Sequence, residues 1–311
     1  MAVSRTTEHI REVNARYHDV AAGDYDAKWG IDFGALGGDQ VLMKLAKALG
    51  GLPEAPFAHA LEIGAGTGYF SLNLLRAGIV ARATCTDVSP GMLAVLEGNA
   101  RRLGLEVETR DVEASALPFA DASFDLVLGH AVLHHLPDLE GAFEEFARVL
   151  APQGTLVFAG EPSRYGDHIA TVPKQLAVRL APFWRGLVRA SARNGDGSNG
   201  DDCGSDHSLE GEVDVHAFTP GQLARLARDA GLQRVRIRGE ELTANWFGWA
   251  NRTLEASAEP SEIPMLWRRY AHRGYLLLQQ VDRHLLEPRL PAGAFYNLIL
   301  SAHKPPQGGP P

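Results

Sequence analysis

The chain has 311 residues, 45% hydrophobic and 22% charged, which is typical of a soluble globular protein with room for one large α/β domain or two small ones. Its formal net charge of -8 argues against a nucleic-acid-binding surface, which usually leaves a basic footprint. No run approaches the roughly 18 consecutive apolar residues that would span a membrane.

Two features favour a cytoplasmic location. The first residues, MAVSRTTEHIRE, are polar and lack the apolar core of a signal peptide. The only cysteines, Cys85 and Cys203, lie outside any Cys-x-x-Cys spacing. This pattern suits a reducing compartment and predicts neither a disulfide framework nor a cysteine zinc site.

Short β-type runs alternate with helix-type runs through the middle of the chain, which is the pattern of a parallel sheet built from βαβ units. The predicted strands are His59–Gly64, Ala83–Val88, Glu106–Asp111, Phe124–His130 and Thr155–Glu161. The predicted helices between them are Tyr69–Ala77, Pro90–Leu103 and Leu139–Leu150. Pro137 and Asp138 are start signals for the last helix, and Pro152 and Gly154 are its stop signals.

The alternation breaks after Glu161. Thr171–Arg193 is predicted to be one amphipathic helix, apolar with interspersed Lys and Arg, and the pattern favours packing of one face on the core over binding to a membrane surface. The following segment, 194–215, has seven acids, five glycines and no Lys or Arg. That composition cannot bury a core and predicts a mobile loop.

Order returns with a predicted helix at Thr219–Ala230 and strands at Val235–Arg238 and Ala294–His303. We therefore expect a doubly wound α/β fold with a seven-stranded, mostly parallel, Rossmann-like sheet and helical insertions. The expected parts are an N-terminal helical lid at 1–55, a cofactor-binding core at 56–240 that includes the mobile acidic loop 194–215, a helical aromatic-rich insertion at 241–292 as an acceptor lid, a final core strand at 293–304 and a disordered tail at 305–311.

A glycine loop follows the first predicted strand. In LEIGAGTGYF, Gly64, Gly66 and Gly68 lie between a strand and a helix, where glycine permits a tight turn and close approach of a ligand to the backbone. Asp87 closes the next strand, where a carboxylate can accept hydrogen bonds from both hydroxyls of an adenosine ribose, and Asp111 closes the third. All these features fall on the carboxyl edge of the sheet, where open parallel sheets bind ligands.

The spacing of the glycines separates two kinds of ligand. The dinucleotide fingerprint G-x-G-x-x-G would need its third glycine at position 69, which is Tyr69, and the Tyr-x-x-x-Lys pair of many nicotinamide reductases is absent. The spacing G-x-G-x-G after an acidic residue resembles the first motif of class I S-adenosylmethionine-dependent methyltransferases. TDVSPGML, RDVEASALPFADASFDLVLGHAVLHHLPD and RVLAPQGTLVFAGEP resemble their later motifs, in order, over most of Ala58–Glu161. The most similar group is the small-molecule, quinone-biosynthesis-like group sometimes called type 11.

The resemblance implies a role for each matching residue. Glu62 would help to hold the amino group of S-adenosylmethionine, and Asp87 would bind the ribose hydroxyls. Asp111 would accept a hydrogen bond from the adenine amino group, and His130 would lie by the methionine end. The other cofactor-binding positions that the resemblance implies are Gly64, Ala65, Gly66, Thr67 and Gly68 around the methionine and ribose, and Val88, Met92 and Val112 around the adenine.

Methyl transfer from a sulfonium is an in-line displacement that needs chiefly proximity and alignment, and a base helps when the acceptor is a hydroxyl, an amine or an acidic carbon. His130 and His134 are the candidate bases. His135 is adjacent to His134, so only one of the two can easily face the cofactor, and both also have a structural interpretation as hydrogen-bonded turn residues. No carboxylate at a suitable spacing suggests a metal site with these histidines.

The expected function is methyl transfer from S-adenosylmethionine to a small, apolar or aromatic acceptor at oxygen or carbon. A Rossmann-type NAD(P)-dependent reductase and a non-catalytic S-adenosylmethionine-binding protein remain the alternatives. The expected partner is a small-molecule acceptor, with no nucleic acid and no stable membrane insertion, and a homodimer is left open.

Overall fold

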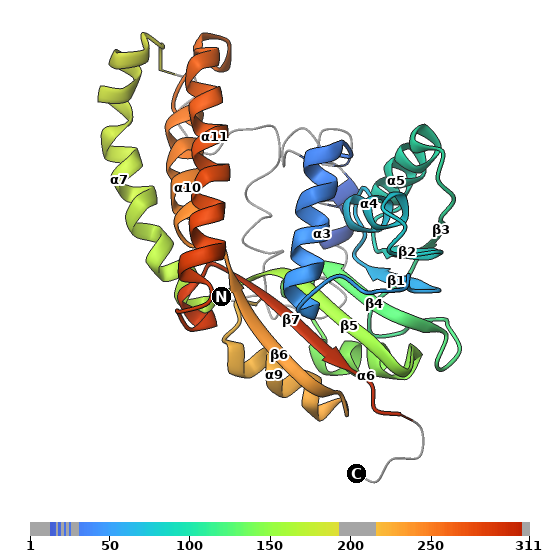
Figure 1. Cartoon of the computed structure of the whole chain (residues 1–311). Coiled ribbons are helices and arrows are strands. Elements are labelled where there is room, and N and C mark those ends of the chain that lie inside the picture. The colour runs from blue at the N-terminus through green and yellow to red at the C-terminus, as the bar shows by residue number, and fades with distance from the viewer. Residues whose placement is uncertain are drawn as a thin grey trace, which may run out of the picture. The chain divides into compact units, whose positions relative to one another are not determined.

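The computed structural model describes residues 13–16, 18, 19, 22, 25, 31–192 and 216–306 (Figure 1). The acidic segment expected to be mobile, 194–215, and residues 307–311 of the expected tail lie outside the described residues. The chain forms two compact units, the first of residues 1–161, 208–237 and 299–311, the second of residues 162–207 and 238–298. Each unit is treated by itself below.

A seven-stranded sheet has the order β3-β2-β1-β4-β5-β7-β6. The strands are β1 (Ala60–Ile63), β2 (Ala83–Asp87), β3 (Glu108–Asp111), β4 (Phe124–His130), β5 (Leu150–Pro162), β6 (Gln233–Glu240) and β7 (Asn297–His303). The pairs β1–β2, β1–β4, β2–β3 and β4–β5 are parallel. The start of β5 bonds the residue after β7, since Gln153 donates to the Lys304 carbonyl, so β5 and β7 run antiparallel. The predicted doubly wound, mostly parallel fold is confirmed.

The central strands are buried on both faces, which explains their nearly continuous apolar sequences. Every residue of β1 and of β2 is buried, including the polar side chains of Thr84 and Thr86. Strands covered by helices on both sides have no solvent-facing row, so the alternation of apolar and polar residues typical of a half-exposed strand is lost.

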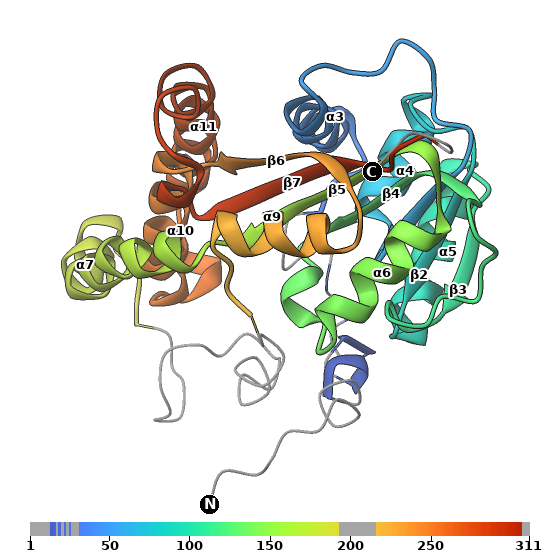
Figure 2. The same cartoon turned by 90° about the horizontal axis from the view of Figure 1, so that it is seen from below.

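Helices cover both faces of the sheet within the first unit. They are α3 (Ala35–Leu49), α4 (Tyr69–Arg76), α5 (Pro90–Leu103), α6 (Leu139–Val149) and α9 (Pro220–Asp229). Figure 2 shows α3 and α4 on one side and α6 and α9 on the other. Residues of α3, α4 and α5 share one core cluster with β1, β2 and β4, so α3 is a layer of the α/β core, whereas the sequence placed residues 1–55 in a lid.

The helix α5 shows how local sequence sets an element that later borders the site. Its N-cap, Ser89, accepts a hydrogen bond from the Met92 amide, and Pro90 occupies the first turn, where its missing N–H costs nothing. Gly104 ends the helix in the left-handed conformation. These signals lie in the sequence itself, and the predicted bounds of α5 are the observed ones.

β5 begins earlier than the sequence predicted. Pro152 and Gly154 were expected to end the preceding helix, but both lie inside the strand, whose pairing with β4 shifts register between Phe124 and Leu126. Gln153 between them has a positive φ of 64°. Pro and Gly are tolerated in strands at such irregular positions, so their stop signal applied to the helix but not to the strand that follows directly.

The second unit contains three long helices, α7 (Arg164–Val188), α10 (Thr243–Ala256) and α11 (Met265–Val281). α10 packs against both α7 and α11, and the Trp184 and Trp267 rings of α7 and α11 meet edge to face with centroids 5.0 Å apart. α7 starts at Arg164, not at Thr171, because Ser163 caps it by accepting from the Gly166 amide. Among the residues that the structure describes, no helix is both long and apolar enough to cross a membrane.

Candidate functional site

A cavity opens at the carboxyl ends of β1, β2 and β4, inside the first unit. Parallel α/β sheets bind ligands at this edge, because loops and helix N-termini converge there. The lining residues are Asn14, His18, Tyr25, Ile63, Gly64, Gly66, Thr86, Asp87, Val88, Met92, Val112, Glu113, Ala114, His130, Ala131, Val132, His135, Leu136 and Pro137.

The glycine loop borders this cavity through Gly64 and Gly66. Gly64 has a φ of +60°, and a Cβ there would lie 2.3 Å from Cγ2 of Val132, so no other residue fits without moving the turn after β4. Gly66 has a φ of +52°, and a Cβ there would meet no atom within 4 Å. The backbone at Gly66 is therefore open to a ligand.

Asp87 is buried at the end of β2 and holds the glycine loop in place. Its Oδ2 accepts a hydrogen bond of 2.8 Å from the Gly66 amide, and its Oδ1 accepts one of 2.9 Å from the Ser89 amide. Burial raises the pKa of the Asp87 carboxyl to about 6, although the bonds from backbone amides act in the opposite direction. Each carboxylate oxygen can accept a second hydrogen bond, so a ligand with two neighbouring hydroxyls could bind here.

Glu62 does not line the cavity, although the resemblance implied a contact with the cofactor. Its side chain is buried, and Oε2 accepts a hydrogen bond of 3.0 Å from the Ser71 amide in the first turn of α4. Burial raises the pKa of Glu62 to about 7, opposed by its hydrogen bonds with Ser71. In this structure Glu62 joins β1 to the N-terminal end of α4, where a negative charge is favoured.

His130 lines the cavity from the end of β4. Its ring stacks on Phe70, with centroids 4.8 Å apart, and meets Tyr69 edge to face. On the other side it packs over Gly160, where a Cβ would lie 2.8 Å from His130 Nε2. The imidazole is thus held by α4 and β5 beside the glycine loop.

The turn after β4 separates the two adjacent histidines. His134 is buried, and its Nδ1 lies 2.9 Å from Oε2 of Glu161, which also accepts hydrogen bonds from the amides of Val132, Leu133 and His134. His134 therefore does not line the cavity, in contrast to the expectation that it is a candidate base. His135 lines the cavity instead.

Residues from the N-terminal part of the chain complete the lining. Asn14 Nδ2 donates to the His135 carbonyl at 3.2 Å. Asp19 Oδ1 accepts from the Ser89 hydroxyl at 2.5 Å and from the Gly91 amide at 2.9 Å, which ties this segment to the start of α5. The His18 ring lies against His135, with centroids 5.6 Å apart, and burial lowers the pKa of His18 to about 4.

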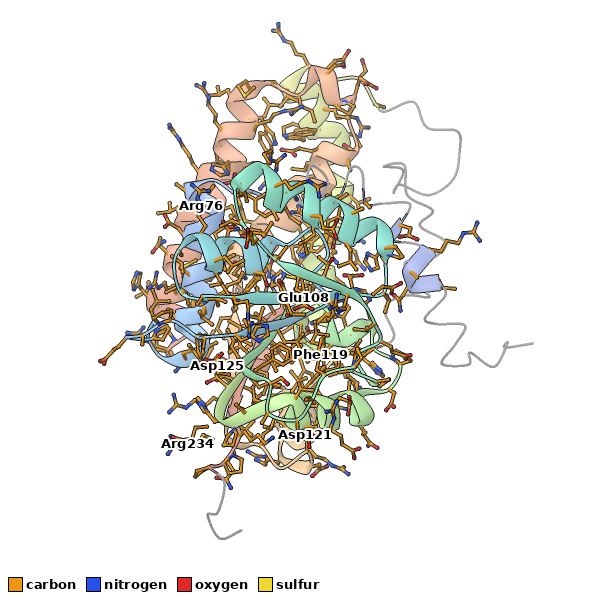
Figure 3. All side chains as sticks on the ribbon, turned by 90° about the vertical axis from the view of Figure 1, so that its right-hand side faces the viewer. Arg76, Glu108, Phe119, Asp121, Asp125 and Arg234 are labelled. Carbon is orange, nitrogen blue, oxygen red and sulfur yellow. The ribbon has the colours of Figure 1, made fainter. Side chains whose placement is uncertain are left out.

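The floor of the cavity continues into the loop that precedes β4. Val112, Glu113 and Ala114 line the cavity, and the loop beyond them is fixed by Arg148 of α6, which donates to the Phe119 carbonyl and to the Asp121 carboxylate at 2.7 and 2.8 Å. Figure 3 labels Phe119 and Asp121 in this loop. Asp111, the expected adenine contact, is exposed and does not line the cavity.

The structure thus gathers part of the predicted set. The predicted residues that line one cavity are Gly64, Gly66, Asp87, Val88, Met92, Val112 and His130. Ala65, Thr67 and Gly68 belong to the same loop without lining it. Within the described ranges, no group of three or more His, Cys, Asp or Glu side chains could hold a metal ion.

A family model described as a methyltransferase domain matches residues 61–158, which span β1 to β5 and most of the cavity lining. Residues 61–158 are a methyltransferase domain. Members of this family use S-adenosylmethionine. The resemblance to class I methyltransferases is confirmed for this stretch.

Two curated relatives carry different printed activities. A demethylmenaquinone methyltransferase of Thermus thermophilus is 35% identical over 137 residues, which are 44% of this chain and 62% of the relative. A malonyl-[acyl-carrier protein] O-methyltransferase of Methylococcus capsulatus is 35% identical over 192 residues, which are 61% of this chain and 62% of the relative. The chain therefore spans less than two thirds of the length of these relatives.

A solved structure extends the likeness of fold over nearly the whole chain. The phosphoethanolamine N-methyltransferase 2 of Haemonchus contortus, in complex with S-adenosyl-L-methionine, has a TM-score of 0.59 and 16% sequence identity. The alignment covers 95% of this chain and 60% of that one. At this identity the likeness shows the methyltransferase fold and leaves the acceptor open.

Proposed function

We propose that the chain is an S-adenosylmethionine-dependent methyltransferase that acts on a small acceptor. The observation that carries the proposal is the cavity at the carboxyl edge of the sheet, where Gly66 presents open backbone and Asp87 presents a buried carboxylate. Both lie within residues 61–158, the stretch that matches the methyltransferase domain.

The cavity supplies a plausible environment for each part of the nucleoside. Asp87 accepts from the ribose hydroxyls, using the lone pairs that the Gly66 and Ser89 amides leave over. Val88, Met92 and Val112 give an apolar surface for the adenine, and the backbone at Gly66 admits the methionine part. When bound, S-adenosylmethionine supplies an electrophilic methyl group on a sulfonium.

The acceptor is proposed to be small and apolar or aromatic, methylated at oxygen or carbon. His130 is the residue proposed to remove a proton from it, because its ring lines the cavity and is held by Phe70 and Gly160. His134 is less suited to this role, because Glu161 and burial retain it. The two curated relatives act on different acceptors by name, so neither name is carried over.

Calorimetric titration of the purified chain with S-adenosylhomocysteine, NADH and NADPH tests the cofactor. We expect one-site binding of S-adenosylhomocysteine alone, weakened at least about tenfold in Asp87→Ala and unchanged in Asp39→Ala, which removes an exposed carboxylate from α3. Binding of a nicotinamide cofactor alone would favour the reductase alternative. Tight binding of S-adenosylhomocysteine, without methyl transfer to any acceptor in a broad screen, would favour the non-catalytic alternative.

A further inference from the structure

The helix α7 has two apolar rows on neighbouring faces, and only one of them is packed within the second unit. Ala170, Ala177, Ala181 and Trp184 of the first row are buried, and α7 packs against α10. The small side chains of this row allow the two helices to approach closely. This face accounts for the amphipathic pattern that the sequence predicted.

The other row of α7 consists of large apolar side chains that are exposed. We call it the α7 stripe, and it comprises Tyr165, Ile169, Val172, Leu176, Leu180, Phe183 and Leu187. Successive members lie three or four residues apart, and between 42% and 76% of each side chain is exposed. At 3.6 residues per turn, the stripe falls within an arc of about 80°. A continuous exposed apolar row of this kind marks an interaction surface.

The charges on the same unit indicate what covers the stripe. α7 contains Arg164, Lys174, Arg179 and Arg185 but only one acid, and α11 contains three arginines and no acid. Lys and Arg therefore outnumber acids by seven to one on these two helices, in a chain whose net charge is -8. A basic surface around an apolar row is complementary to an anionic layer with an apolar interior.

We propose that the second unit binds reversibly to the surface of an anionic lipid bilayer, with α7 lying in the plane of the interface. The α7 stripe enters the boundary between headgroups and acyl chains, and the exposed Arg164 and Arg179 remain at the level of the anionic headgroups. A second copy of the chain fits this surface less well, because it would bring the same basic residues against one another. The proposal rests on exposure and charge and is independent of the proposed methyl transfer.

Flotation of the full chain with lipid vesicles tests the proposal. The vesicles are of phosphatidylcholine alone or of phosphatidylcholine mixed with phosphatidylglycerol. We expect flotation with the mixed vesicles only, and a loss of bound protein when salt is added, because salt screens the attraction between Arg or Lys and the headgroups.

The variant Leu176→Gln with Phe183→Gln should lower the partition coefficient at least about tenfold, because both side chains are exposed members of the stripe. Val178→Gln is the matched control, since Val178 is 61% exposed on α7 but lies about 160° away from the centre of the stripe. Arg179→Gln should also weaken flotation, whereas Arg101→Gln, which changes an exposed arginine of α5 in the first unit, should not.

Three outcomes would overturn the proposal. They are no flotation with either vesicle, equal flotation with neutral and anionic vesicles, and equal loss in Val178→Gln and in the stripe variant. If light scattering shows a dimer that the stripe variant dissociates, and vesicles bind nothing, the stripe is an interface between copies. Titration of each variant with S-adenosylhomocysteine reports on the first unit, so failure of one proposal is distinguishable from failure of the other.

Discussion

Glu161 Oε2 lies 2.9 Å from Nδ1 of His134, and the Glu161 side chain is fully buried. The same carboxylate accepts hydrogen bonds of 3.0 Å from the Val132 and Leu133 amides. One side chain at the end of β5 thus holds the backbone turn that follows β4. Since that turn lines the cavity and touches Gly64, the shape of the cavity depends on Glu161.

Glu161→Ala should destabilise the chain by roughly 3 kcal/mol, because it leaves several buried donors without an acceptor. Chemical denaturation measures the loss. Glu144→Gln, which removes an exposed carboxylate from α6, is the control and should change the unfolding free energy by less than about 0.5 kcal/mol. Equal stabilities of the two variants would show that the turn does not depend on Glu161.

The affinity for S-adenosylhomocysteine should fall as the pH decreases below about 6. The pKa of Asp87 is raised to about 6 by burial, so the carboxylate that accepts the ribose hydroxyls becomes protonated below that value. Titration calorimetry between about pH 8 and about pH 5 would show the decrease. Asp87→Asn should bind weakly at every pH, and a parallel decrease in that variant would assign the effect to another group.

Glu62→Gln should become more stable relative to the wild type as the pH rises from about 4.5 to about 7. Burial raises the pKa of Glu62 to about 7, so the folded chain holds a proton that the unfolded chain releases, and the wild type loses stability over this interval. The difference in unfolding free energy should grow by at most about 3 kcal/mol. Denaturant titrations at several pH values measure it, and a difference that stays constant with pH would contradict this assignment.

Gly64→Ala should cost more stability than Gly104→Ala. Both glycines have a positive φ, +60° and +69°, so both variants carry a similar backbone strain of about 1 kcal/mol. A Cβ at Gly64 also meets Val132 at 2.3 Å, whereas one at Gly104 meets nothing within 4 Å. The difference in unfolding free energy, expected to exceed roughly 2 kcal/mol, isolates the contact with the turn. Equal losses would mean that the turn moves away without cost.

Much of the fold was predictable because its signals are local. The bounds of β4 and α5 were predicted as observed, since caps, Pro and Gly mark them in the sequence. The assignment of α7 to a second unit with α10 and α11 was not predicted. An amphipathic pattern shows that a helix has an apolar face, but the partner of that face is chosen by contacts far along the chain, and α7 has two such faces.

The site was predictable where the strand ends determine it. Asp87 and His130 end β2 and β4, and parallel strands bring their ends to one edge of the sheet. The choice between His134 and His135 was not predictable, because it depends on the buried carboxylate of Glu161, 27 residues away in the chain. Asn14 was missed because it carries no motif, whereas His18 and Tyr25 fall in the segment Tyr17–Gly30, which the sequence indicated as a lid.

The hydrogen bonds of Asp19 with Ser89 and Gly91 have a kinetic consequence. They fasten to the start of α5 a segment whose neighbours His18 and Tyr25 line the cavity, so a bound nucleoside exchanges with solvent only as often as this fastening opens. We expect Asp19→Asn to raise the association and dissociation rate constants of S-adenosylhomocysteine several-fold each, measured by stopped-flow fluorescence, with a small change in their ratio. A change in the dissociation rate constant alone would show instead that Asp19 stabilises the bound state. The pace of turnover would then be set at this latch, before any chemistry at the methyl group begins.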